Sequence, residues 1–354
     1  MFYFILLIVL TILSGCLYKG RIISKKTACI IISISAIIIY GIRSANVGNI
    51  DIPRYVYIFD SFKYLRFKDV ATQYTKDLGF YYFSKFISTI FHNYNLWLTA
   101  IGTLFILSVS TLIVKFSKDI IISYFIFFTF FFAINFSLLR HCTALSFVVL
   151  GYVAIKDKKT QQGLFFLILA SLFHLSSIIS MFLFLLKKIK FGKWNFVMML
   201  LTVFISRLIP DLLSKIVLLI NMDRLSHYAS SEVMRLTNSA FIIHFTLFLI
   251  ILLLIRIKDK RILQKYSFEL NMYTVGISFY ALVGVLAEFL RTAMFFSFIL
   301  IVLLPNILND NLKSKNSPFF LLGGVIFIVM LLIYFFSTVL IDAELLPYET
   351  IFTN

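Results

Sequence analysis

Hydrophobic residues form long continuous runs, separated by short polar stretches, along the whole chain of 354 residues. A run of about 20 apolar residues is long enough for a helix to cross roughly 30 Å of hydrocarbon. Because the runs are continuous rather than alternating, they predict helices and exclude a membrane β-barrel. The predicted spans lie near residues 2–18, 27–42, 96–114, 120–138, 141–155, 194–209, 240–256, 270–286, 291–308 and 318–341.

Two shorter apolar runs, near residues 163–173 and 175–186, are flanked by lysine clusters at both ends. A single crossing would place one of these clusters on the wrong side of the membrane. We therefore expect a broken or re-entrant pair of half-length helices that turns at His174, about 17 Å each at 1.5 Å per residue. Such backbone is tolerated at that depth only where protein shields it or a wet cavity surrounds it. One tilted helix that breaks the charge rule is the alternative.

Twenty of the 33 Lys and Arg residues fall into six short clusters between the runs. Placing all six in the cytoplasm, as the positive-inside rule favours, gives one threading with both termini outside. The clusters begin at Lys19, Lys115, Lys156, Lys187, Arg256 and Lys313. The predicted fold is all-α, one polytopic membrane domain over residues 1–354 with about 12 transmembrane segments. Two extracytoplasmic loops are predicted, at 43–95 with an amphipathic piece around Phe80–Phe91, and at 210–239.

The composition supports a membrane protein, with 61% hydrophobic and 14% charged residues. A soluble domain carries about 25% charged residues. The formal charge of +17 would suit nucleic acid, but the lysines occupy inter-helix loops, so no nucleic-acid partner is expected. Cys16, Cys29 and Cys142 show no pairing or ligand spacing, and no nucleotide-binding motif occurs. We expect no metal and no cofactor.

The positive residues outside the clusters are mostly arginine, eight Arg against five Lys. Arginine grips phosphate oxygens with a planar fork and stays charged when desolvated. Their position opposite the clusters predicts recognition of a polyanion, such as a lipid pyrophosphate, at the outer membrane face. The alternative is that each arginine only snorkels or pairs with a nearby acid.

Two arginines stand out because they border or lie within apolar runs. Arg140 ends the run before it and is followed at once by another span, and Arg291 lies three residues after Glu288. Charged residues at such depth are expensive and usually face an internal cavity. Glu288 and Arg291 share a helical face, so they form either an ion pair or a phosphate site that the glutamate orients.

Polar residues of the first outer loop form a second group of candidates. Arg43, Asp51 and Tyr55 follow the second span directly, and Asp51 is either a general base or the cap of a short helix. Asp77 either contributes to the site or ends a loop and starts the amphipathic helix. Arg224, in the second outer loop, is a further candidate for binding substrate.

His174 lies among Leu and Phe at the predicted helix break. An unperturbed imidazole titrates near pH 6.5, so it could act as a base or as a neutral donor. A hydrogen-bonded core histidine is the alternative.

In these features the chain resembles the EpsG-like branch of Wzy-type polymerases, over nearly its whole length. The resemblance rests on the following residues: Arg43, Gly48, Asp51 and Tyr55 in the first outer loop, Asp77, Gly79 and Phe80 after it, Arg140 in mid-chain, Ala170, His174 and Ser176, the late Arg291, and Pro347 with Tyr348 near the C-terminus.

The resemblance implies a GT-C-like outer cavity and a glycosyltransferase that polymerises undecaprenyl-diphosphate-linked oligosaccharides into O-antigen or capsular polysaccharide. The active site would face the periplasm from the bacterial inner membrane. Arg140 and Arg291 would hold the leaving pyrophosphate, and Asp51 or His174 would act as the base. Arg43, Tyr55, Asp77, Glu288 and Arg224 would bind substrate, and a membrane protein that regulates chain length is an expected partner. A flippase for lipid-linked sugars and an O-antigen ligase are the alternatives.

Overall fold

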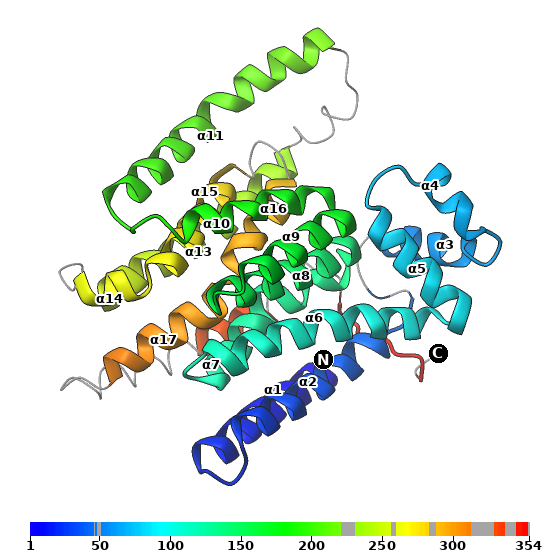
Figure 1. Cartoon of the computed structure of the whole chain (residues 1–354), viewed down its shortest axis with the longest axis horizontal. Coiled ribbons are helices and arrows are strands. Elements are labelled where there is room, and N and C mark those ends of the chain that lie inside the picture. The colour runs from blue at the N-terminus through cyan, green and yellow to red at the C-terminus, as the bar shows by residue number, and fades with distance from the viewer. Residues whose placement is uncertain are drawn as a thin grey trace. The chain divides into compact units, whose positions relative to one another are not determined.

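The computed structural model describes residues 1–45, 47, 51–220, 231–255, 260–282, 288–312, 329–336 and 345–352 (Figure 1). Within this part of the chain every regular element is a helix, and the one β-bridge joins Arg43 to Thr350. The chain divides into two compact units. The first comprises Met1–Ile178 with Leu312–Asn354, and the second comprises Ile179–Asn311.

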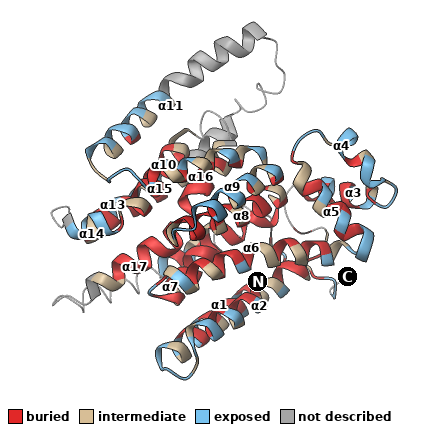
Figure 2. Ribbon diagram, viewed as in Figure 1, coloured by how far each residue is buried: buried red, intermediate tan, exposed pale blue. Residues whose placement is uncertain are grey.

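The first unit is built around α6, which packs against α2 and α8, while α9 packs along α8 and α1 packs along α2. Most residues of α8 are buried (Figure 2), because other helices surround it. Helix α5 covers the predicted amphipathic piece around Phe80–Phe91. The α-helices of this unit that precede residue 178 are α1 Phe2–Lys19, α2 Lys25–Gly41, α3 Asp51–Ser61, α4 Val70–Gln73, α5 Leu78–Phe91, α6 Tyr94–Phe116, α7 Ile120–Phe127, α8 Leu139–Lys156 and α9 Thr160–Phe173.

Three of the predicted basic clusters meet at one end of the first unit. Lys19 forms an ion pair with Asp119 at 2.7 Å, and Lys115 forms one with Asp157. The ammonium group of Lys25 donates to the backbone carbonyl oxygens of Val114 and Ser117, at 2.7 and 2.6 Å. Since the ends of α1, α6 and α8 and the starts of α2 and α7 come together here, the starts of α6 and α8 lie at the opposite end.

Four helical segments of the described residues are long and apolar enough to cross a membrane, namely Phe2–Lys19, Tyr94–Phe116, Leu139–Lys156 and Phe289–Asp310. Five shorter apolar helices accompany them. The predicted span 120–138 is helical but irregular, because a π-helical turn at Phe128–Phe132 and a 3-10 turn at Ile134–Phe136 follow α7. The predicted all-α fold is thus confirmed for the described residues and is consistent with a membrane protein, while the count of about 12 crossings and the outer cavity stay predictions.

The predicted break near residue 174 is confirmed. Helix α9 ends at Phe173, and His174 has extended backbone angles of φ −155° and ψ 113°. A 3-10 helix, η4 (Leu175–Phe182), and the short α10 (Leu183–Leu186) follow. The turning back of the second half of this pair stays a prediction.

In the second unit α15 packs against α11, α13 and α16. The predicted outer loop 210–239 is helical up to residue 220 and again from residue 231, and the predicted span 291–308 is divided between α16 and α17. Most of the predicted span 318–341 lies outside the described residues. The helices of this unit beyond α10 are α11 Lys193–Ile220, α13 Ser231–Ile255, α14 Lys260–Lys265, α15 Ser267–Leu282, α16 Glu288–Ser297 and α17 Leu300–Leu312.

Candidate functional site

Two side chains and one backbone N–H from distant parts of the first unit meet at the carboxylate of Asp77. One carboxylate oxygen, Oδ2, accepts a hydrogen bond from Arg140 Nη1 at 2.8 Å and lies 3.4 Å from His174 Nδ1. The other, Oδ1, accepts from the backbone N–H of Leu175 at 2.8 Å. Asp77 therefore contacts every other member of the group, which we call the Asp77–Arg140–His174 cluster, and lies at its centre.

The backbone around Asp77 is specialised for this role. Asp77 has φ 56° and ψ 37°, the left-handed conformation that Asp and Asn tolerate better than most side chains do. Helix α5 starts at the next residue, so the sequence interpretation of Asp77 as the end of a loop and the start of the amphipathic helix is confirmed. The two interpretations of Asp77 are compatible, because the left-handed turn directs its carboxylate toward α8 and α9.

Gly79 allows α5 to approach α9 closely. A Cβ atom at this position would lie 3.0 Å from the carbonyl carbon and oxygen of Leu172 and 3.0 Å from the ring of Phe173. These neighbours include backbone atoms, which cannot move aside as a flexible side chain can. The close approach sets the end of α9 against the start of α5, and thereby brings the Leu175 N–H and His174 to Asp77.

Arg140 lies in the first turn of α8 and is fixed by two partners. Its Nη1 donates to Asp77, and its Nε donates to the hydroxyl oxygen of Tyr55 at 3.2 Å. The Tyr55 ring is buried against Phe80 and Trp97, with centroids 6.0 and 6.5 Å away. The Arg140 side chain still keeps 28% of its surface exposed, against 5% for Asp77, so the guanidinium can also contact an anion.

The Asp77 carboxylate stays ionised within this cluster. Burial alone would raise the pKa of Asp77, but the hydrogen bonds from His174 and the Leu175 N–H, with the nearby positive charges, outweigh burial. The pKa is therefore lowered below its ordinary value of 3.8. At neutral pH the group is a fixed negative charge that orients Arg140 and His174.

His141 is a neighbour of the cluster that sequence reasoning did not select. Its ring is buried and meets the ring of His174 edge to face, with centroids 6.0 Å apart and an interplanar angle of 86°. The only signal in the sequence was its position directly after Arg140.

Arg43 is fully buried in the first unit and does not line an open surface. Its guanidinium lies 5.3 Å from the ring centroid of Tyr40 and 5.0 Å from that of Phe136. Among the described residues its three side-chain nitrogens have no hydrogen-bond partner. Cation–π attraction to the two rings therefore stabilises this charge in part.

The C-terminal residues hold the backbone beside Arg43. The Ser44 N–H donates to the carbonyl of Glu349, and the Ile351 N–H donates to the carbonyl of Ile42, both at 3.0 Å. The hydroxyl of Tyr348 donates to the carbonyl of Ile39. The Asn95 amide adds bonds to the carbonyls of Gly41 and Arg43, at 2.8 Å each. The segment that contains Pro347 and Tyr348 thus fixes the backbone at the start of the first outer loop.

The remaining candidates are placed singly. Asp51 is the first residue of α3, and Arg291 lies in α16 of the second unit with an intermediate exposure. Glu288 starts α16, but its side chain lies outside the description, as do Gly48 and Arg224 entirely. Within the described ranges no group of three or more His, Cys, Asp or Glu residues is arranged to hold a metal ion.

Comparison with known proteins gives one match. A family model described as the EpsG family matches residues 26–350, which is nearly the whole chain. No curated protein and no solved structure matches the chain.

Proposed function

Because the chain belongs to the EpsG family, whose members are relatives of Wzy-type polymerases, we propose that it polymerises lipid-linked oligosaccharides. The repeat units would be carried on undecaprenyl diphosphate, and the product would be O-antigen or capsular polysaccharide. The observation that supports this activity is the Asp77–Arg140–His174 cluster, because it combines a partly exposed cation with an imidazole held by a carboxylate.

The reaction transfers the growing chain to a new repeat unit. The bond between the anomeric carbon of the chain and the diphosphate oxygen breaks, and the diphosphate leaves with the electron pair. A bond forms between that carbon and a hydroxyl oxygen of the acceptor sugar. The hydroxyl proton passes to a base, so the reaction needs a cation at the leaving group and a base at the acceptor.

Arg140 is suited to the leaving diphosphate. Negative charge develops on the oxygen that departs, and a fixed guanidinium stabilises this charge without reorganising. Asp77 and Tyr55 occupy Nη1 and Nε of Arg140, so they hold the fork while leaving Nη2 for phosphate. Tyr55 and Asp77 then act through Arg140 as positioning residues. The sequence also indicates Arg291 as a phosphate ligand, and its role is tested by its own substitution.

His174 is the preferred base of the two candidates. A carboxylate at Nδ1 favours the tautomer with its proton on that atom, which makes Nε2 the basic nitrogen. Asp77 Oδ2 lies 3.4 Å from Nδ1 and supplies this partner. Asp51 at the start of α3 is the alternative base.

The site would face the outer side of the bacterial inner membrane. In the first unit the cluster residue Arg140 lies in the first turn of α8, whereas Lys156 and three basic clusters lie at the other end of the same helix. The positive-inside rule places those clusters in the cytoplasm. A membrane protein that regulates chain length is a proposed partner.

The experiment uses purified full-length protein in lipid with synthetic undecaprenyl-diphosphate-linked repeat units, and products are separated by size. Wild-type protein should form a ladder of lipid-linked oligomers. Arg140→Ala and Arg291→Ala should lower the rate about 10²–10³-fold, as loss of a transition-state donor does. Arg140→Lys keeps the charge but cannot reach two partners and phosphate together, so it should recover only a small part of the rate.

His174→Ala and Asp51→Asn decide between the two bases, since only loss of the true base should remove the pH dependence of the rate. Movement of the lipid-linked unit between leaflets without any ladder would contradict the polymerase and favour a flippase. Transfer to a lipid A acceptor alone would favour a ligase.

A further inference from the structure

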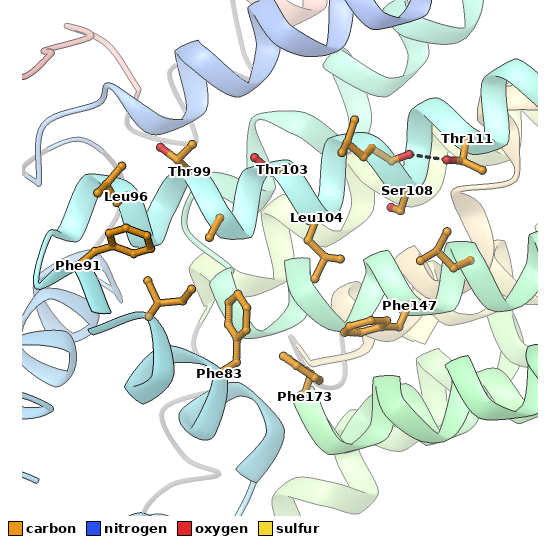
Figure 3. Close-up of a pocket in the computed structure, with 14 residues that line it drawn as sticks. Phe83, Phe91, Leu96, Thr99, Thr103, Leu104, Ser108, Thr111, Phe147 and Phe173 are labelled. Carbon is orange, nitrogen blue, oxygen red and sulfur yellow. Dashed lines mark hydrogen bonds between the residues drawn. The ribbon is translucent and has the colours of Figure 1, made fainter. Parts of the chain in front are cut away.

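A long apolar groove runs beside the candidate site in the first unit. Its volume is about 630 Å³, and it follows α6 from Leu96 to Thr111. Phe83 and Phe91 of α5, Phe147 of α8 and Phe173 of α9 form its other walls, as Figure 3 shows. None of the residues that line it carries a charge.

Three of the four hydroxyl-bearing residues that line the groove bond to their own helix. The hydroxyls of Thr99, Ser108 and Thr111 donate to carbonyls of their own helix, at 2.7, 2.7 and 2.8 Å. The bond from Thr111 to Leu107 is drawn in Figure 3. Since these hydroxyls are already satisfied, they do not require a polar ligand, and the groove suits an aliphatic chain.

The length and direction of the groove match a lipid tail in the membrane. The 15 residue steps from Leu96 to Thr111 span about 22 Å of helix, most of the roughly 30 Å of hydrocarbon. The first residues of α6 lie beside Arg43, and its last residues lie beside the basic clusters at the opposite end of the first unit. The groove therefore extends from the end of the first unit that bears the candidate site toward the opposite end.

The groove also reaches the residue next to the Asp77–Arg140–His174 cluster, because Phe173 lines it. Phe173 precedes His174 directly, and its ring lies 4.9 Å from that of Phe147 and 6.0 Å from that of Phe83. Arg140 and Phe147 are seven residues apart on α8, so they share a helical face at about 10 Å separation along the axis. A lipid with its diphosphate at Arg140 would have its first hydrocarbon units at Phe147.

We propose that this groove binds the polyprenyl chain of the donor, the growing lipid-linked polysaccharide. The inference rests on the proposed function, because it takes the donor's diphosphate to lie at Arg140. The groove fixes the position of the leaving lipid along α6 and α8. The bond to be broken then lies between Arg140 and the acceptor. It also selects a polyprenyl chain over a short isoprenoid, which could not fill it.

The first test is photo-crosslinking of wild-type protein in phosphatidylglycerol vesicles with a diazirine-bearing polyprenyl diphosphate. Crosslinks are expected in the peptides of α6 and α8, and unlabelled undecaprenyl diphosphate should suppress them while added phosphatidylglycerol does not. Equal suppression by phosphatidylglycerol would overturn the inference and assign the groove to ordinary lipid. Crosslinks confined to other helices would overturn it as well.

Ala100 and Thr103 of α6 line the groove. The second test fills the groove with Ala100→Trp and Thr103→Trp, and uses Leu13→Trp as the control. Leu13 is 52% exposed on α1 and does not line the groove. Wild type and control should have a KM at least about tenfold lower for an undecaprenyl-linked than for a farnesyl-linked unit, a difference of about 1.4 kcal/mol. The two groove variants should lose this preference while keeping kcat for the farnesyl-linked unit.

The outcomes separate this inference from the proposed function. A ladder with unchanged chain-length preference in both groove variants would overturn the groove and leave the polymerase standing. No ladder in wild type, with crosslinks still in α6 and α8, would overturn the polymerase and leave the groove as a polyprenyl diphosphate site. Thermal unfolding of each variant in detergent identifies any that fail to fold, and the crosslinking result then decides.

Discussion

At the scale of single residues, Asp77 joins the start of α5 to α8 and to the end of α9. It pairs with Arg140, faces His174, accepts from the Leu175 N–H and begins α5 in a left-handed conformation. Its sequence neighbourhood predicted only a loop end or one contributing acid. Its central role depends on residues 63 and 97 positions away, which no local pattern connects to it.

The pH dependence of stability should reveal the ionised state of Asp77. Its folded pKa lies below 3.8, so its ionic contacts stabilise the fold above that pH and are lost as the pH falls through the folded pKa. Asp77→Asn keeps a side chain that tolerates the left-handed backbone, and should cost about 1–3 kcal/mol at pH 6. Thermal unfolding in detergent should show this difference from wild type shrinking between pH 5 and pH 3. A constant difference over that range would contradict the ionised pair.

At the scale of elements, the close contact of α5 with α9 positions the cluster. Sequence reasoning identified both halves of this contact, the amphipathic helix and the break at His174, because each leaves a local signal in apolar periodicity or in flanking charge. It did not identify their contact, which depends on the missing side chain of Gly79. From the sequence, a glycine in a short motif indicates that a side chain would not fit or that the backbone needs an unusual conformation. It does not indicate which helix packs against that glycine.

Gly79→Ala should separate α5 from α9. The added Cβ would meet Leu172 backbone and the Phe173 ring at 3.0 Å, and we expect a loss of about 1–3 kcal/mol in unfolding free energy. Activity should fall further than stability, because the shift also moves Asp77 from His174. Gly192→Ala is the matched control, since a Cβ there meets nothing within 4 Å. Equal oligomer yields from the two variants would show that the contact does not position the site.

Other elements differ from expectation for physical reasons. The predicted loop 210–239 is helical over residues 210–220 and 231–239, since Pro210 lies within α11 and does not end it. The predicted span 291–308 lies within the apolar helical segment Phe289–Asp310, and a turn at residues 298–299 divides that segment into α16 and α17. Apolar runs give the length of a membrane segment more reliably than its internal breaks.

At the scale of the whole molecule, the first unit has two chemically distinct ends. Lysines with Asp119 and Asp157 occupy one end, and Arg43, Asn95 and Arg140 mark the other. The two ends were expected from charge alone, since Lys serves as a topology signal and Arg as a ligand for anions. The ion pairs that join these helix ends, Lys19 with Asp119 and Lys115 with Asp157, were not expected. They depend on which helix ends are neighbours in the fold.

Cysteine labelling tests this polarity. In a variant with Cys16, Cys29 and Cys142 replaced by Ser, single cysteines are placed at Tyr64, which is 83% exposed, and at the exposed Lys159. A membrane-impermeant thiol reagent should label Tyr64→Cys in intact spheroplasts and Lys159→Cys only after permeabilisation. Labelling of both from the same side would contradict the threading.

The sequence by itself determined the helical membrane class, the family, the break at His174 and most of the residues that form the candidate site. It could do so because run length, basic clusters and isolated polar residues are properties of short segments. The tertiary structure decided which of these residues meet. Asp77 became the centre, Tyr55 a support for Arg140, Arg43 a buried cation and His141 a neighbour, because each role depends on contacts between helices distant along the chain.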